Sequence, residues 1–479
     1  MSSQKHIEHA AIWSAIDVSI RFGLKFVVLI ILARLLAPED FGLVAMLLIF
    51  ISIGTVLIES GFSQGLIQRA NTTHIDESSI FFFTIVMGGA VATALFLSSF
   101  QISEFFEQPV LESMVCWFAF NIFINSFGVI HITLLTKELD FKTLTKVNIT
   151  ATLVSSLIAV VMAFQGWGVW SLVVQVISST VLTVIMLWLL HSWRPLWVFS
   201  VASIKSYFKF GGFLLFTALL YSLYVNLYAV LIGKQYSAEA VGFFAQAKRL
   251  QQLPVDLMSN IVGRVAFPVF SKIHNDKDKL ARGMRKALVL VMFINAPLML
   301  GILMLAEPLI RILFGEKWLV SAPILEVLAL VGLLWPMHEL NVKVLVAQGH
   351  SAINAKIQLI KVTVGILLLF LAVPYGILAV AYSQLIASVF GYFVNAYYTK
   401  KFIGYGGWKQ IRDVLPYVIA SFFMMFGVFI VSWSLDVSYQ LEFILSIIVG
   451  ATTYLVACKF LKLEALEYVM QLKIKGITK

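Results

Sequence analysis

The sequence is poor in charged residues and has almost no cysteine. Only 13% of its 479 residues are Asp, Glu, Lys or Arg, whereas soluble domains carry about 25%. Apolar residues make up 60% of the chain, and the mean hydropathy is +0.93. These values exclude a soluble enzyme, a secreted disulfide scaffold and a disordered protein. Because the alternating ten-residue strands of an outer-membrane barrel are also missing, the composition predicts an all-α polytopic membrane protein.

The few residues that bind metals or phosphates do not form a recognisable site. The two cysteines, Cys116 and Cys458, lie far apart in or beside apolar stretches. We predict small buried side chains there, and neither a disulfide nor a metal pair. His131 and His338 lie within apolar stretches, where hydrogen-bonded packing is expected. The sequence has no glycine-rich phosphate loop, which argues against ATP hydrolysis, and no cofactor is expected.

Apolar stretches long enough to cross a membrane recur along the whole chain. A helical span needs about 20 mostly apolar residues. The candidates are 10–33, 41–64, 79–100, 112–136, 146–164, 168–190, 207–233, 241–268, 287–306, 319–346, 356–373, 376–398, 414–434 and 440–460. The sequence therefore predicts about fourteen transmembrane helices and leaves no stretch for a soluble domain. We expect the first span to remain in the mature protein, because it is charged and no cleavage site follows it.

The basic residues are distributed unevenly over the connections between these spans. Of the 35 Lys and Arg residues, 24 fall in the set of connections that includes both termini. The opposite set contains only Arg34, Lys234, Arg311 and Lys317. Since cytoplasmic loops are enriched in Lys and Arg, both termini are predicted to be cytoplasmic. The formal charge of +10 is thus assigned to the membrane surface, and no nucleic-acid partner is expected.

A segment near residue 34 is repeated 200 residues later without a gap. Each copy is an external turn between two predicted spans. The matching residues are Arg34, Glu39, Gly42 and Ala45 in the first copy, and Lys234, Glu239, Gly242 and Ala245 in the second. The repeat predicts two pseudo-symmetric six-helix lobes, residues 1–206 and 207–400, followed by two extra helices and a cytoplasmic tail in residues 401–479.

The first span carries three charged residues at helical spacing. Asp17, Arg21 and Lys25 follow one another at four-residue intervals, so they lie on one helical face. Arg21 is about 16 Å from the start of the span, near the bilayer midplane. A charge at that depth is costly and usually faces protein or a water-filled cavity. Because Asp17 can neutralise Arg21 but hardly both cations, we predict a positively charged cavity that suits an anionic ligand; the alternative is a structural ion pair.

Two later spans also contain polar residues. Tyr221 and Tyr224 in span 7 suit stacking against sugar rings, although packing explains them equally well. In span 10, Glu339 and Lys343 are spaced to form an ion pair. Pro336 in the same span is expected to break or kink the helix, which would make this span either a gate element or a kinked structural helix.

Several segments resemble a known family of transporters. They are 35–46, 59–69, 241–249, 267–271, 314–318 and 322–325. These segments are similar to those of Wzx-type lipid-linked oligosaccharide flippases in the multidrug/oligosaccharidyl-lipid/polysaccharide exporter superfamily, in particular to its lipopolysaccharide, colonic-acid and teichuronic-acid export branch. The resemblance covers about residues 10–400 and is silent on the sugar. It implies two lobes around a central cavity, and flipping of undecaprenyl-diphosphate-linked oligosaccharide across the bacterial inner membrane by alternating access.

The resemblance also implies roles for individual residues, because family members usually have a cationic cavity. The candidates for cargo binding are Arg21, Lys25, Arg249, Lys343, Tyr221 and Tyr224. The candidates for charge balance, or for coupling to a Na⁺ or H⁺ gradient, are Asp17, Glu59 and Glu339. The implied partners are the lipid-linked oligosaccharide and membrane lipids, with the polysaccharide polymerase machinery as a further candidate.

Two other functions stay open at this point. A cation-coupled multidrug antiporter of the same superfamily would suit a lobe rich in acids better than one with Arg21 and Lys25. A membrane enzyme that polymerises or ligates glycans would normally need a larger external loop and paired catalytic carboxylates, which the sequence lacks. The flippase is therefore the first hypothesis, and no enzymatic activity is expected.

Overall fold

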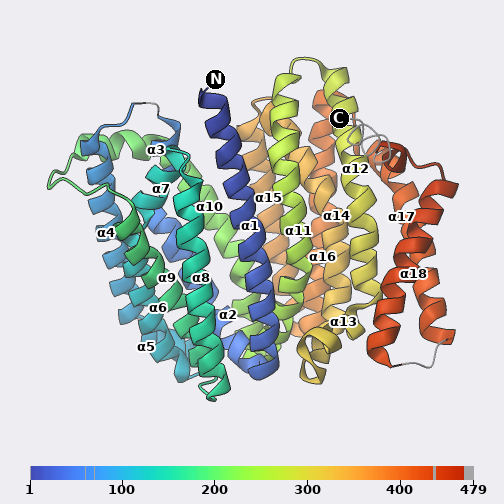
Figure 1. The fold of residues 1–479 in the computed structure, drawn as a ribbon, viewed down its shortest axis with the longest axis horizontal. Helices are drawn as coiled ribbons and strands as arrows, with labels where there is room; N and C mark the ends of the chain where they lie inside the picture. Colours follow the sequence, from blue (N-terminus) through green and yellow to red (C-terminus); the bar gives the residue numbers. More distant parts are fainter. Residues whose placement is uncertain (1, 60, 70, 435–437, 469–479) are drawn as a thin grey trace. The chain divides into compact units, whose positions relative to one another are not determined.

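The structure is a computed structural model that describes residues 2–59, 61–69, 71–434 and 438–468 (Figure 1). All regular elements in these ranges are helices. Within the described residues, twelve helical segments are long and apolar enough to cross a membrane, and they correspond to twelve of the predicted spans. The other two predicted spans, 10–33 and 241–268, lie in α1 (Ser2–Leu35) and α11 (Ala238–Lys272), which contain more charged residues. The predicted helical membrane fold is confirmed.

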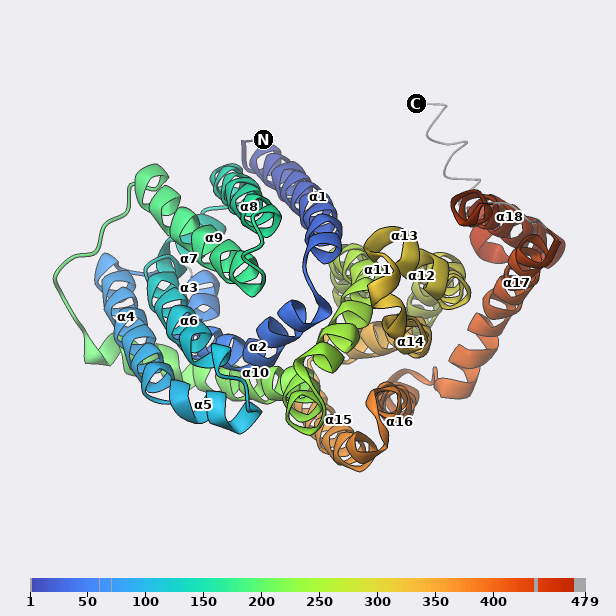
Figure 2. The ribbon, with the colours of Figure 1, turned by 90° about the horizontal axis from the view of Figure 1, so that it is seen from below.

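The chain divides into two compact units, and the first comprises Met1–Gly242. After α1 it contains α2 (Pro38–Glu59), α3 (Phe62–Gln68), α4 (His74–Leu97), α5 (Ser99–Phe106), α6 (Val110–Ser126), α7 (Val129–Lys137), α8 (Phe141–Phe164), α9 (Val169–Leu190) and α10 (Val201–Gln235). α8 packs between α1 and α9, and α4 packs against α6 (Figure 2). α10, which the repeat assigns to the second lobe, packs against α2 in this unit.

The second unit comprises Phe243–Lys479. Beyond α11 it contains α12 (Lys277–Met304), α13 (Ala306–Phe314), the 3₁₀ helix η1 (Glu316–Ser321), α14 (Ala322–Ala347), α15 (Ser351–Ala372), η2 (Val373–Tyr375), α16 (Ile377–Ile403), α17 (Gly407–Ser434) and α18 (Tyr439–Phe460). α12 packs against both α14 and α17, and α18 packs against α17. Fully buried side chains such as Leu288, Met292 and Leu340 form the core of this unit.

α14 continues through Pro336, so the broken helix is excluded and the alternative of a kinked structural helix stays open. Proline has no backbone N–H, which leaves the carbonyl four residues earlier without its helical donor. Asn295 of α12 replaces that donor: its Nδ2 donates to Gly332 O at 3.2 Å and to Leu333 O at 3.3 Å. The neighbouring helix thus supplies the hydrogen bond that the proline removes, and α14 stays continuous.

The two copies of the sequence repeat fold alike and contact each other. Each copy has a helix, a two-residue turn and a new helix at positions that differ by 200, which confirms the predicted short turns. A Cβ atom on Gly42 would lie 1.6 Å from Ala238 O, and one on Gly242 would lie 2.0 Å from Pro38 O. The contact is reciprocal, as it is between copies related by a two-fold axis. Both positions therefore need glycine, because the two backbones touch there.

The cysteines and histidines noted in the sequence have packing roles. Cys116 and Cys458 are both free thiols, and Cys458 is fully buried. The Nδ1 atoms of His131 and His191 lie 2.9 Å apart and share a hydrogen bond. Both ring nitrogens of His338 contact side chains of α16. The predicted packing roles are confirmed for Cys458, His131 and His338, whereas Cys116 is only half-buried.

Candidate functional site

Asp17 and Arg21 of α1 form the ion pair that their spacing predicts. Asp17 Oδ2 and Arg21 Nη2 are 2.6 Å apart, and Asp17 is buried. Asn148 of α8 donates its Nδ2 to the second carboxylate oxygen at 3.4 Å. Thr145, also on α8, donates to the backbone oxygen of Trp13 at 3.2 Å. The Asp17 carboxylate is thus fixed by two helices, and α8 positions the charged face of α1.

The cations of α1 are more accessible than its acid. Arg21 is half-buried, and its Nε is a buried donor without a hydrogen-bond partner among the described residues. Lys25, one turn further, is exposed. Glu59, at the end of α2, is also exposed and makes no hydrogen bond or ion pair with any described residue. The pairing of Asp17 with Arg21 therefore leaves one buried N–H donor of Arg21 without a hydrogen-bond partner among the described residues.

The tyrosines of α10 lie beside a polar contact that the sequence analysis missed. Tyr221 is 61% exposed, and Tyr224 is half-buried. Next to them, Ser222 donates to Ser52 Oγ of α2 at 2.8 Å, and Asn226 Nδ2 donates to the same oxygen at 3.0 Å. Small polar residues within spans commonly form hydrogen bonds across helices. The i, i+4 spacing of Ser222 and Asn226 places them on one helical face, and this pattern could have predicted the contact.

The second unit contains the other predicted ion pair. Glu339 Oε1 and Lys343 Nζ of α14 are 3.1 Å apart, and both side chains are about three-quarters buried. Both residues lie in the C-terminal half of α14, beyond Pro336. Arg249 of α11 is exposed. The predicted pairing is confirmed, and the binding roles of Lys343 and Arg249 stay predictions.

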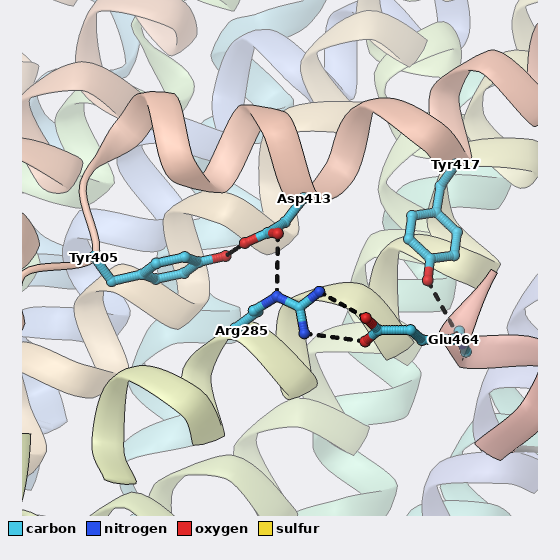
Figure 3. A network of polar contacts seen from close by, with 6 residues as sticks. Arg285, Tyr405, Asp413, Tyr417 and Glu464 are labelled. Atoms are coloured by element: carbon cyan, nitrogen blue, oxygen red, sulfur yellow. Dashed lines mark hydrogen bonds and ion pairs between the residues drawn. The ribbon is translucent and has the colours of Figure 1, made fainter. Parts of the chain in front are cut away.

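Figure 3 shows a polar network that joins parts of the chain that the sequence analysis did not connect. Arg285 Nε of α12 donates to Asp413 Oδ1 of α17 at 3.1 Å. Its Nη1 and Nη2 donate to the two carboxylate oxygens of Glu464, at 3.0 and 2.9 Å. Tyr405 donates to the remaining Asp413 oxygen at 2.7 Å. Burial and the bond to Asp413 raise the pKa of Tyr405, so it remains a donor near neutral pH.

This network fastens the C-terminal helices to α12. Tyr417 of α17 adds a further link, since its hydroxyl accepts a hydrogen bond from Ala465 N at 3.3 Å. The bidentate bonds from Arg285 lower the pKa of Glu464, which keeps this carboxylate charged. No spacing rule predicts this network, because Asp413 and Glu464 lie 128 and 179 residues beyond Arg285 in the chain. Its role is structural.

Comparison with known proteins decides the family. The profile of the family described as "Polysaccharide biosynthesis protein" matches residues 31–323, more than half of the chain. The chain belongs to this family.

Two curated relatives extend the match along most of the chain. The teichuronic acid biosynthesis protein TuaB of Bacillus subtilis (strain 168) is 28% identical over 406 residues, which are 84% of each chain. The lipopolysaccharide biosynthesis protein WzxC of Escherichia coli (strain K12) is 28% identical over 363 residues, 75% of this chain and 74% of WzxC. The two relatives are named for the biosynthesis of teichuronic acid and of lipopolysaccharide.

A solved structure has a fold similar to that of this chain. The lipid II flippase MurJ in an inward closed conformation superposes with a TM-score of 0.76 at 16% identity, covering 94% of this chain and 98% of MurJ. At this identity the similarity concerns the fold alone. The profile match includes Glu59, Tyr221, Tyr224 and Arg249. It begins after the charged residues of α1 and ends at residue 323, at the start of α14. The roles of the charges on α1 and α14 therefore depend on their own geometry.

Proposed function

We propose that the chain flips an undecaprenyl-diphosphate-linked oligosaccharide from the cytoplasmic to the outer leaflet of a bacterial inner membrane, by alternating access. Membership of the polysaccharide biosynthesis protein family carries the proposal. The names of TuaB and WzxC point to surface polysaccharides, and MurJ, which has the same fold, is named as a flippase of lipid II. These similarities favour a lipid-linked glycan over a drug as cargo.

The charges within the helices suit such a cargo. The diphosphate linker is anionic, and the cations of α1 and α14 lie within spans, where an unsolvated charge is costly without an anion or water. Arg21, Lys25, Arg249 and Lys343 are the proposed cargo ligands, with Tyr221 and Tyr224 against the sugars. The chemistry needed is binding and release alone, so the proposal includes no catalytic residue.

The test uses a deletion strain of the source organism and its extracted lipids. We expect a complete lipid-linked repeat unit to accumulate on the cytoplasmic side while surface polysaccharide falls. The wild-type gene should restore export, and Arg21→Ala combined with Lys25→Ala should not. Lys205→Ala is the matched control, because Lys205 is an exposed cation at the start of α10.

Two results would contradict parts of the proposal. Normal lipid intermediates, together with changed sensitivity to cationic drugs, would favour the antiporter and overturn the flippase. Full export by the folded double variant would instead remove Arg21 and Lys25 from the binding site while leaving the flippase intact.

We propose that Asp17, Glu59 and Glu339 balance the cavity charge or couple transport to an ion gradient. The exposure of Glu59 supports access to ions. Proteoliposomes with an imposed Na⁺ or H⁺ gradient test this, and transport that responds to neither gradient would leave product consumption outside the cell as the driving force.

A further inference from the structure

Lys361 is a charged residue at the middle of a membrane-spanning helix. Ten residues precede it in α15 and eleven follow it, so it is about 15 Å from either helix end. Lysines near helix ends extend their ammonium groups to the membrane surface, but a four-carbon side chain cannot cover that distance. The charge of Lys361 therefore stays within the depth of the membrane.

A glycine on the neighbouring helix provides the space for this side chain. A Cβ atom on Gly391 of α16 would lie 3.0 Å from Lys361 Cε, and 3.4 Å from its Cδ and Cγ. The apolar stem of the lysine thus lies against the backbone of α16. The stem is held by packing, while the residue remains partly exposed.

The ammonium group of Lys361 has no direct partner among the described residues. Glu339 is close enough to act on its charge, but the carboxylate of Glu339 is already paired with Lys343 at 3.1 Å. His338 is next to Glu339, and both its ring nitrogens are engaged: Asn395 donates to Nδ1, and Nε2 donates to Ser388 Oγ. A histidine that accepts at Nδ1 is neutral, so it adds no charge to the cluster.

The cluster therefore has two ammonium groups and one carboxylate within the membrane. Such an excess charge is costly unless an anion or water compensates it. Fold stability alone does not require Lys361, because it forms no bond that its removal would break. An anionic ligand that binds in the cluster would compensate the excess positive charge.

We propose that Lys361, together with Lys343, binds an anionic group of the transported glycolipid, either a phosphate of the diphosphate linker or a carboxylate of an acidic sugar. The inference rests on the proposed function, because it assigns the cargo chemistry to this cluster. It adds a ligand on α15 to the predicted cargo-binding residues.

The test measures binding to the purified full-length chain in lipid nanodiscs. The probes are undecaprenyl diphosphate, undecaprenol as the same lipid without phosphate, and a uronic-acid oligosaccharide. The variants are Lys361→Met, Lys361→Arg and Lys356→Met. Lys356 is the matched control because it is exposed and lies on the same helix near its start.

We expect Lys361→Met to weaken binding of an anionic probe about tenfold or more, with an unchanged or higher melting temperature. Lys361→Arg should retain most of the affinity, and Lys356→Met should bind like the wild type. A loss confined to undecaprenyl diphosphate would identify phosphate as the ligand, and a loss confined to the uronic acid would identify a carboxylate. Undecaprenol binding should not change.

Three results would overturn the inference. Equal binding by wild type and Lys361→Met would exclude the site and leave the flippase standing. A large fall in the melting temperature of Lys361→Met, with Lys361→Arg also failing to bind, would make the lysine structural. Failure of the wild type to bind either anionic probe would count against both the site and the proposed function.

Discussion

Arg285 and Lys361 lie in the same unit, yet their charges are compensated in opposite ways. Arg285 is bound by two carboxylates, from α17 and from the segment after α18. Lys361 lies at the middle of α15 and has no direct partner among the described residues, while the nearby Glu339 is paired with Lys343. A charge with a full set of partners holds helices together. A charge retained in the membrane without them is better explained by a ligand than by the fold.

The largest expected effect comes from removing the fully bonded cation. Arg285→Ala leaves Asp413 and Glu464 without their shared partner, and we expect a loss of about 1–2 kcal/mol of stability, since the group is partly exposed and screened. Thermal unfolding of the purified protein measures it. Arg282→Ala is the control, because Arg282 is an exposed cation on the same helix. If both variants unfolded at the wild-type temperature, Arg285 would not fasten α17 to α12.

Acid should weaken the same network. Hydrogen bonds from Arg285 lower the pKa of Glu464 from its ordinary value of 4.5. A lowered folded pKa means that the stabilisation is complete above the unfolded pKa and is lost as the pH falls through the folded pKa. We therefore expect Glu464→Gln to lower the melting temperature at neutral pH, and the gap to the wild type to close below about pH 4.5. A gap that is constant with pH would contradict the assigned ion pair.

A double-mutant cycle sharpens the contrast at Lys361. Glu339→Gln removes the carboxylate from a cluster with two lysines, and we expect a loss of about 0.5–1 kcal/mol. Adding Lys361→Met should recover most of that loss, because the excess positive charge disappears. Melting temperatures of the two single variants and the double variant measure the coupling. If the effects of the two single variants simply added in the double variant, Glu339 and Lys361 would not interact. The two lysines and the carboxylate would then not form one cluster with an excess charge.

The sequence predicted the parts of the molecule that depend on local pattern. Span positions follow from runs of apolar residues, and the pairs Asp17–Arg21 and Glu339–Lys343 follow from helical spacing. The two copies of the repeat share the position of their turns, and Glu, Gly and Ala recur at corresponding positions in both.

What the sequence missed depends on contacts between distant helices. The effect of Pro336 on α14 is cancelled by Asn295, a residue 41 positions earlier on another helix. The Arg285 network joins residues 413 and 464 to 285, and no spacing rule relates them. Lys361 stands only five residues into the predicted span 356–373, whereas the bounds of α15 place it at the centre of the helix.

The smallest effect is expected where an ion pair is exposed. Lys234 Nζ and Glu107 Oε1 lie 2.8 Å apart, closer than Glu339 and Lys343, but the Glu107 side chain is 82% exposed. Lys234 lowers the pKa of Glu107, yet water and salt screen an exposed pair so strongly that Lys234→Met should leave the melting temperature unchanged. A fall in the melting temperature of Lys234→Met as large as that of Arg285→Ala would contradict the contrast between exposed and fully bonded charges. The distance between two charges alone would then decide how much they stabilise the fold. An unchanged value would show that the number of partners and the burial of a charge decide it, which is the criterion that separates Lys361 from the structural charges.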